Sequence, residues 1–155
     1  MCLFWQTQGC SAFAAIGGLS GTATLAALDS SDDVTEDIVL PFTFKWLGEY
    51  DVTVVRVSSN GFINVDKDNV PSAAAGGPGS AAFCSSLSLP TCPAIELDDT
   101  FEPRIAVMHE DLHPGTSGSV FTRYVTCPEE AFIVSWEGVD YFGTSIGEVN
   151  AQIVM

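Results

Sequence analysis

The segment HEDLH at residues 109–113 matches the H-E-x-x-H pattern of zinc proteases. In those enzymes a helix places two histidines on one face, where both bind one zinc ion while the glutamate polarises a water. Here PRIAVM (103–108) alternates as a strand, and Pro114 follows His113 directly. Because a proline stops a helix, we interpret His109 as the end of a strand and His113 as the start of a turn, both solvated.

Acidic residues around this motif suggest a different metal. The segments ELDDTFE (96–102) and HEDLHP (109–114) both lie at ends of predicted strands. The simpler interpretation is that their carboxylates are solvated turn residues. The alternative is a Ca²⁺ site, since Ca²⁺ takes six to eight oxygen ligands. Its predicted ligands are Asp98, Asp99, Glu110 and Asp111.

A second acidic run, DSSDDVTED, occupies residues 29–37. Its spacing resembles a calcium loop, but it lacks the glycine and the terminal glutamate of an EF-hand. Asp111 has a structural alternative as well, because an aspartate at a strand end can accept hydrogen bonds from the N–H groups of the next turn.

The segment VSSNG (57–61) has a structural explanation. Asn60 and Gly61 are expected to supply the positive φ values of a tight hairpin. Ser58 and Ser59 are expected to point out of the strand. Neither histidine is near them in sequence, so a serine nucleophile with an adjacent base is not indicated.

Alternation of apolar and polar residues with period two dominates the chain, which is typical of strands. No segment shows a capped helical stripe. Seven or eight short strands bounded by Gly, Pro or Asp predict an all-β, antiparallel β-sandwich of jelly-roll or immunoglobulin-like type. The aromatic residues Phe42, Phe44, Trp46, Tyr124, Phe132 and Trp136 are expected in the core or half-buried on the sheets. The predicted strands are residues 22–28, 38–48, 51–59, 62–65, 103–108, 119–125, 131–138 and 148–155.

The predicted domain organisation is an N-terminal segment (1–21) followed by one sandwich domain (22–155). Residues 66–102 form a long insertion rich in Ala, Gly and Ser, and a loop of this length favours a functional role. The chain stops within its last predicted strand, residues 148–155. We therefore expect that the closing strand is missing, either because the sequence is a piece of a longer chain or because another chain supplies the strand. An open sheet edge invites such pairing.

The five cysteines favour an oxidising compartment. Cys84 and Cys92 bracket a Ser- and Pro-rich loop and are spaced for a disulfide, and Cys2 and Cys10 could form a second one. Cys127 is then left over, as a buried thiol or as the partner in an intermolecular bond.

Composition excludes several classes of function. Twenty acidic and five basic residues give a net charge of −15, and the bases are scattered, so binding to nucleic acids or anionic membranes is not expected. No apolar run approaches the roughly 18 residues of a membrane span. The N-terminus is a poor signal peptide, and no N-glycosylation sequon occurs.

Four segments resemble one family in order along the chain. LPFTFKWLGEYDVTVVRVSSNGFINVD (40–66) is similar to the pattern lPFxFxfyGxxYxxvxVSSNGfixf. RIAVMHEDLHP (104–114) resembles a strand ending in W-x-D-L-x-P, AFIVSWEGV (131–139) an f-v-v-x-W strand, and GEVNAQIVM (147–155) an f-q-v-x-L strand. The chain is thereby identified, over residues 22–155, as a member of the nidogen-like extracellular β-sandwich family, which includes plexin-domain-containing proteins.

The resemblance implies an extracellular, adhesive or structural module without catalytic activity. The chain departs from the pattern at Met108 and His109, where the family favours Trp before its acidic pair, and in the 66–102 insertion. We therefore expect a non-catalytic structural or adhesive module, with protein partners or self-assembly through its open edge into a larger surface assembly or filament. The alternatives are a Ca²⁺-dependent glycan-binding module and, most remotely, a zinc hydrolase using His109, Glu110 and His113.

Overall fold

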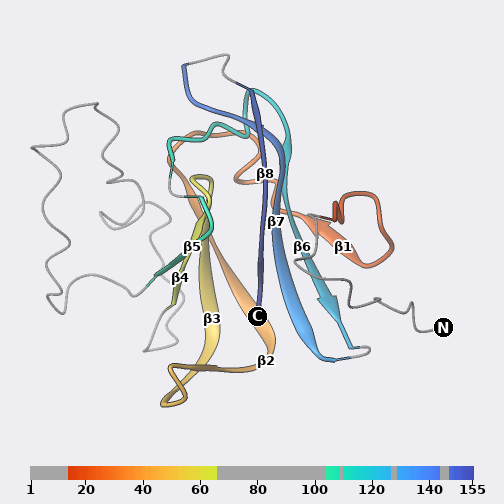
Figure 1. The fold of residues 1–155 in the computed structure, drawn as a ribbon, viewed down its shortest axis with the longest axis vertical. Coiled ribbons are helices and arrows are strands. Elements are labelled where there is room, and N and C mark those ends of the chain that lie inside the picture. Colours follow the sequence, from red (N-terminus) through yellow and green to blue (C-terminus); the bar gives the residue numbers. More distant parts are fainter. Residues whose placement is uncertain (1–13, 66–103, 109, 127–128, 144–146) are drawn as a thin grey trace, which may run out of the picture.

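The computed structural model describes residues 14–65, 104–108, 110–126, 129–143 and 147–155 (Figure 1). These residues form eight strands and no helix. The strands are β1 (Thr22–Thr24), β2 (Thr35–Trp46), β3 (Tyr50–Ser58), β4 (Phe62–Val65), β5 (Arg104–Ala106), β6 (Ser119–Val125), β7 (Ala131–Asp140) and β8 (Glu148–Val154).

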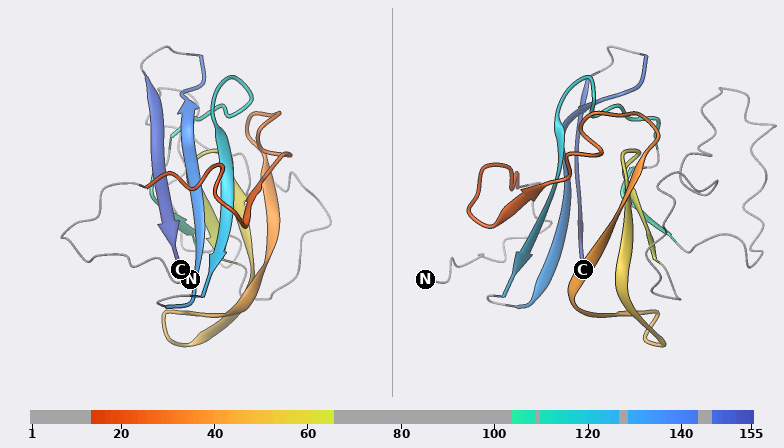
Figure 2. Two further views of the ribbon diagram at one scale, coloured as in Figure 1. Left: turned by 90° about the vertical axis from the view of Figure 1, so that its right-hand side faces the viewer. Right: turned by 180° about the vertical axis from the view of Figure 1, so that it is seen from behind.

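The strands form two antiparallel sheets of four strands each. Sheet A has the order β1-β6-β7-β8, and sheet B has the order β2-β3-β4-β5. Figure 2 shows the two sheets as facing layers. The prediction of an all-β antiparallel sandwich is therefore confirmed, whereas the predicted insertion at 66–102 lies outside the described residues.

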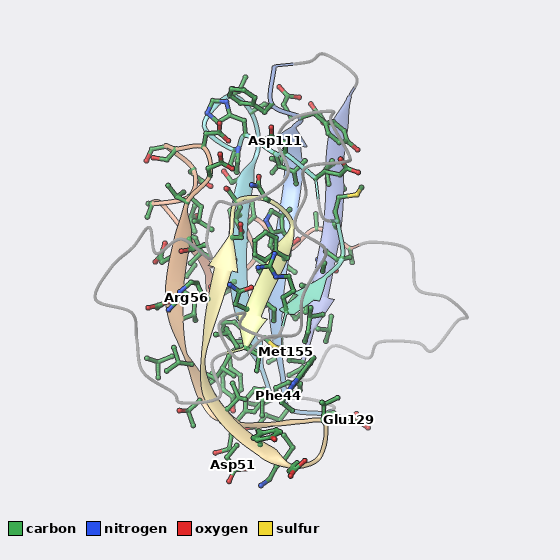
Figure 3. The ribbon with its side chains drawn as sticks, turned by 90° about the vertical axis from the view of Figure 1, so that its left-hand side faces the viewer. Phe44, Asp51, Arg56, Asp111, Glu129 and Met155 are labelled. Atoms are coloured by element: carbon green, nitrogen blue, oxygen red, sulfur yellow. The ribbon has the colours of Figure 1, made fainter. Side chains whose placement is uncertain are left out.

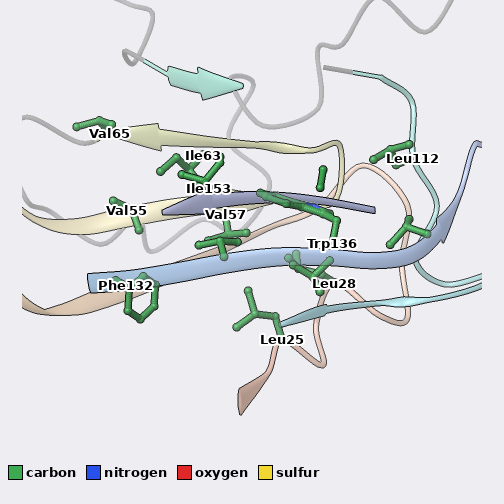
Figure 4. Close-up of a cluster of buried hydrophobic side chains, with 14 of the residues drawn as sticks. Leu25, Leu28, Val55, Val57, Ile63, Val65, Leu112, Phe132, Trp136 and Ile153 are labelled. Atoms are coloured by element: carbon green, nitrogen blue, oxygen red, sulfur yellow. The ribbon is translucent and has the colours of Figure 1, made fainter. Parts of the chain in front are cut away.

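The core fills the space between the sheets. It combines valines and isoleucines of β3 and β4 with the inward residues of β6, β7 and β8. Trp136 is its largest fully buried side chain, and its indole Nε1 donates a hydrogen bond to the carbonyl oxygen of Ser58 across the two sheets (3.0 Å). Figure 4 shows Trp136 in this cluster, with Leu28 and Val57 nearby. Truncating a core tryptophan costs about 3–5 kcal/mol, so Trp136 contributes strongly to the packing of the two sheets.

Strand β2 changes register within its length. Its pairing with β3 shifts between Val39 and Phe44, and Pro41, which has no N–H to donate, lies in this interval. Beyond the shift Phe44 and Trp46 are partly buried and pack against the core. Phe42 does the same and lies 6.1 Å from the ring of Tyr124, measured between centroids. With Phe132 and Trp136 buried, the predicted placing of the aromatic residues is confirmed, although Tyr124 is 37% exposed.

The first predicted strand, residues 22–28, is shorter in the structure. It ends at Thr24, and a turn follows in which Leu28 N–H donates to the carbonyl oxygen of Leu25 (3.0 Å). Leu25 and Leu28 are both buried in the core. Their spacing of three residues reflects one turn facing the core, which an alternating pattern of seven residues does not distinguish from a strand.

The turn between β3 and β4 also corrects the sequence prediction. Gly61 has a φ of 77°, and a Cβ at this position would lie 2.0 Å from the carbonyl oxygen of Met108, so glycine is required there. Asn60, in contrast, does not have a positive φ. Asn60 is fully buried, and its side chain forms hydrogen bonds with Asp33 and Leu112, which lie outside the hairpin.

Ser58 and Ser59 are fully buried, so the prediction that they point out of the strand is wrong. The Ser58 hydroxyl accepts a hydrogen bond from Asn60 N–H (3.1 Å), and the Ser59 hydroxyl accepts one from Val34 N–H (3.2 Å). Both hydroxyls therefore satisfy backbone groups of neighbouring turns.

No helix of the described residues is long and apolar enough to cross a membrane.

Candidate functional site

The described part of the HEDLH motif is not helical. Strand β5 precedes it, Leu112 forms an isolated bridge with Tyr141, and a turn follows in which Thr116 N–H donates to the carbonyl oxygen of His113 (3.0 Å). Glu110 is exposed and His113 is partly buried, while His109 lies outside the described residues. The helical i, i+4 geometry that a zinc protease requires is therefore missing from these residues.

Three aspartates from two distant segments converge at one end of the sandwich. Asp32, Asp33 and Asp111 each offer a carboxylate oxygen, and these oxygens lie within 4.8 Å of one another. Asp32 and Asp33 belong to the segment between β1 and β2, and Asp111 follows β5. Figure 3 shows Asp111 at one end of the molecule and Asp51 at the other. We call these three residues the acidic cluster.

Asn60 connects the two segments of the acidic cluster. Its Nδ2 donates a hydrogen bond to Asp33 Oδ1 (2.8 Å), and its Oδ1 accepts one from Leu112 N–H (2.8 Å). Asp33 itself has a positive φ of 52°, which aspartate tolerates better than most residues. The turn after β3 thus holds both acidic segments against each other.

Backbone hydrogen bonds fix the second segment on sheet A. Phe142 N–H donates to the carbonyl oxygen of Asp111 (2.8 Å), and His113 N–H donates to that of Asp140 (2.8 Å). The His113 ring lies 5.5 Å from the Phe142 ring, measured between centroids, and its Nδ1 is 2.7 Å from the Thr116 hydroxyl oxygen. The position of Asp111 therefore depends on the end of β7 as well as on Asn60.

Electrostatic repulsion and burial act together in the acidic cluster. Burial raises the pKa of Asp32, the charge of Asp33 raises it further, and the nearby His113 opposes both. Burial likewise raises the pKa of Asp111, to which Asp32 and Asp33 add. Oδ1 of Asp32 and Oδ1 of Asp111 are shielded from solvent and have no hydrogen-bond donor among the described residues. A cation beside these oxygens would relieve both effects.

The acidic cluster suits a hard cation. Carboxylate, amide and carbonyl oxygens are the ligands of Ca²⁺, and sites commonly combine several carboxylates with backbone carbonyls and waters. The described residues near the cluster supply no thiolate, and His113 bonds to Thr116. The donor set therefore fits Ca²⁺ better than Zn²⁺.

Residues of two acidic segments noted in the sequence, 29–37 and 109–114, lie close together in the structure. Asp111 of the predicted calcium ligands is in the cluster, together with Asp32 and Asp33 of the 29–37 run. Glu110 is exposed and is not part of the cluster. Asp98 and Asp99 lie outside the described residues. So do all five cysteines, and the predicted bridges Cys84–Cys92 and Cys2–Cys10 and the state of Cys127 stay predictions.

Sequence reasoning missed the role of Asn60. The dipeptide Asn60-Gly61 has a sufficient explanation as a turn, and its contacts with Asp33 and Leu112 join residues 27 and 52 positions away. No local pattern signals such contacts.

The edge of sheet A is a second candidate for binding. Among the described strands, β8 pairs with β7 and with no other strand. Phe132 and Met155 exchange both backbone hydrogen bonds, each of 2.9 Å. Bonded and non-bonded pairs alternate in an antiparallel ladder, so the backbone groups of Asn150, Gln152 and Val154 point away from β7. These groups form a row of donors and acceptors for a further strand.

The comparison with protein families gives a match over almost the whole chain. The family model described as NIDO related matches residues 4–155. The search of curated proteins and the search of solved structures gave no significant match. The match covers all eight strands, the acidic cluster and the edge strand β8. The chain therefore belongs to the NIDO-related family.

Proposed function

We propose that this chain is a non-catalytic structural or adhesive module of an extracellular protein, which associates with partners by strand addition to β8. Membership of the NIDO-related family indicates an extracellular domain, and the family is generally non-catalytic. The observation that supports the mode of association is the outward row of backbone groups at Asn150, Gln152 and Val154.

The β8 edge carries few of the features that protect edge strands. It is seven residues long, contains no Pro or Lys, and ends at Val154, whose side chain is 63% exposed. Natural sheets usually block such edges with charges, prolines or bulges. The partner we propose is an extended segment of another protein chain, and a second copy is the one to test first. Assembly into a larger surface structure or filament would follow if each copy also offers a strand.

Substitutions at Val154 distinguish association by backbone strand pairing from association by hydrophobic side-chain contact. Val154→Pro removes an outward N–H without removing a hydrogen bond to β7, whereas Val154→Thr keeps the N–H and the branched shape. We expect concentrated wild-type protein and Val154→Thr to associate, and the association constant of Val154→Pro to fall at least about tenfold, as expected for loss of about 1.4 kcal/mol. Sedimentation velocity measures this. A monomeric wild type would contradict self-association.

A second candidate function is Ca²⁺-dependent binding, for example of a glycan. It is favoured by the two shielded carboxylate oxygens of Asp32 and Asp111, for which the described residues supply no hydrogen-bond donor. In this proposal Asp32, Asp33 and Asp111 hold the ion and Glu110 does not. Asp98 and Asp99 remain proposed additional ligands.

Chelation and titration test the ion. Ca²⁺ at a hundred times its dissociation constant should stabilise chelator-treated protein by about 2.7 kcal/mol. The double variant Asp32→Asn/Asp111→Asn should lose this gain, whereas Asp51→Asn, which removes a carboxylate at the opposite end, should keep it. Thermal denaturation with and without Ca²⁺ measures the effect. If Ca²⁺ does not change the melting temperature of the wild-type protein, this candidate function is eliminated.

A further inference from the structure

The outer face of sheet A is crossed by the chain that precedes β1. Figure 2 shows this segment passing over β8, β7 and β6 before it enters β1. Ile16 belongs to no strand, yet it is only 2% exposed. A segment that crosses strands rather than pairing along them needs side-chain partners for its backbone groups. Residues 14–17 find these partners on β7 and β8.

Glu137 on β7 holds two consecutive N–H groups of this segment. The Ile16 N–H donates to Glu137 Oε1 (2.6 Å), and the Gly17 N–H donates to both carboxylate oxygens (3.2 Å each). The Ser135 hydroxyl donates to the same Oε1 (2.8 Å). Hydrogen bonds to a charged acceptor contribute about 1.5–3 kcal/mol, which makes Glu137 the main anchor.

Gln152 on β8 holds the start of the segment. Its Nε2 donates to the carbonyl oxygen of Ala14 (2.6 Å) and to the hydroxyl oxygen of Ser135 (3.1 Å). Ser135 and Gln152 are direct partners in the β7–β8 ladder. Gln152, Ser135 and Glu137 therefore form a continuous polar row across the two strands, with an acceptor for N–H groups at one end and a donor for a carbonyl at the other.

The polar row of Gln152, Ser135 and Glu137 leaves little space for a side chain at position 17 of the bound segment. A Cβ on residue 17 would lie 2.8 Å from Glu137 Oε2 and 2.9 Å from a ring carbon of Phe121. Both distances are shorter than Cβ contacts in real proteins, so any residue larger than glycine must displace a neighbour. The preceding position, Ile16, is buried. The contacts thus favour an apolar residue followed by glycine, because a Cβ at position 17 requires the Glu137 or Phe121 side chain to shift, and otherwise they involve only main-chain atoms.

We propose that Ser135, Glu137 and Gln152 form a binding site for an extended peptide, which residues 14–17 occupy in cis. The ligand class is a short, extended segment with an apolar residue followed by glycine. Displacement of the cis segment uncovers the row and Phe121 for a segment of the same chemistry supplied in trans. This site uses side chains on the face of sheet A, so it is independent of strand addition at the β8 edge.

Hydrogen exchange tests the anchor in the full chain. In wild-type protein the amides of Ile16 and Gly17 should be protected, and Glu137→Ala should speed their exchange at least about tenfold, the effect of losing about 1.4 kcal/mol. Glu148→Ala removes an exposed carboxylate from β8 and should leave both amides unchanged. Wild-type amides that exchange as fast as an unfolded peptide would overturn the proposal, as would Glu137→Ala amides that stay protected.

Binding in trans tests the site itself. Gly17→Ala should displace the cis segment, so that a synthetic peptide of residues 14–22, AAIGGLSGT, binds this variant and shifts the NMR signal of the Gln152 side-chain amide. Wild-type protein should bind the peptide at least about tenfold more weakly because the site is occupied. The double variant Gly17→Ala/Glu137→Ala should not bind. Equal binding by both variants, or none by a folded Gly17→Ala, would overturn the proposal, and if Gly17→Ala does not fold, the exchange experiment decides.

Discussion

Two groups of carboxylates in this sandwich differ in what surrounds them. On the outer face of sheet A, Glu137 accepts hydrogen bonds from two main-chain N–H groups and a serine hydroxyl. In the acidic cluster, Oδ1 of Asp32 and of Asp111 is shielded from solvent, no donor for it lies in the part of the chain that the structure describes, and a third carboxylate lies close by. The first arrangement is complete within the chain, and the second is not.

The difference shows how a carboxylate site can be filled by its own chain or left without a partner. Donors around Glu137 compensate for the water it has lost, so the site that it forms is already filled by residues 14–17. The aspartates lose water and also repel one another, which raises the pKa of Asp32 and Asp111. Groups assembled at a cost in stability are typical of sites that bind something.

Asn60→Ala should be the most damaging change at the acidic cluster. It leaves the buried Leu112 N–H without its acceptor and releases Asp33 from its donor. An unsatisfied buried group costs about 1–3 kcal/mol, so we expect the free energy of unfolding to fall by about 2–3 kcal/mol. Urea denaturation without Ca²⁺ measures the loss.

Asn150→Ala is the matched control for this change. Its Oδ1 also accepts a backbone hydrogen bond, from Gly138 N–H (3.0 Å), but at an exposed position. Water can replace that acceptor, and the expected loss is below about 1 kcal/mol. Equal losses in the two variants would mean that Asn60 does not organise the cluster.

The pH dependence of the free energy of unfolding should reveal the raised pKa values of the buried carboxyl groups. Burial is the largest cause that raises the pKa of Asp32, Glu36 and Asp111. A carboxyl with a raised pKa binds more protons folded than unfolded, so its contribution to stability is complete below the unfolded-state pKa and is lost as pH rises through the folded-state pKa. These groups should therefore lower the free energy of unfolding of metal-free protein as pH rises from their ordinary values of 3.8 and 4.5.

Substitution separates this contribution from that of other groups. Asp32→Asn should make the fall in stability with rising pH shallower and should raise the stability of metal-free protein at neutral pH. Asp51→Asn, at the other end of the sandwich, is the control for the loss of one negative charge. Urea denaturation across the window, with chelator present, measures both slopes. Parallel curves for Asp32→Asn and wild type would mean that burial and the charge of Asp33 do not raise the pKa of Asp32.

Glu110→Gln should have the smallest effect. Its side chain is exposed and lies outside the acidic cluster, so metal-free stability and the gain with Ca²⁺ should both stay within about 0.5 kcal/mol of wild type. Thermal denaturation with and without Ca²⁺ measures the two quantities. A lost response to Ca²⁺ would place Glu110 among the ligands and would favour the ligand set expected from the sequence.

Much of the fold could be predicted from local patterns. Alternation identified the regions of all eight strands, because inward and outward residues alternate along a strand. Boundaries were less accurate where the core is lined by a turn, as at Leu25 and Leu28. The acidic cluster was predicted in part, since both acidic runs were recognised but were treated as separate features.

Residue types and their order along the chain are enough to indicate the fold class, the family resemblance, the net charge of −15 and the incompatibility of Pro114 with a zinc-protease helix. These properties depend on composition and on neighbours along the chain. Which polar side chains lie within contact distance of one another depends on the tertiary structure. It brought Asp32 and Asp33 to Asp111, and it placed Glu137 beneath Ile16, a residue 121 positions away. The physical reason is that sheet register and layer packing, rather than sequence spacing, set the distances between side chains on different strands.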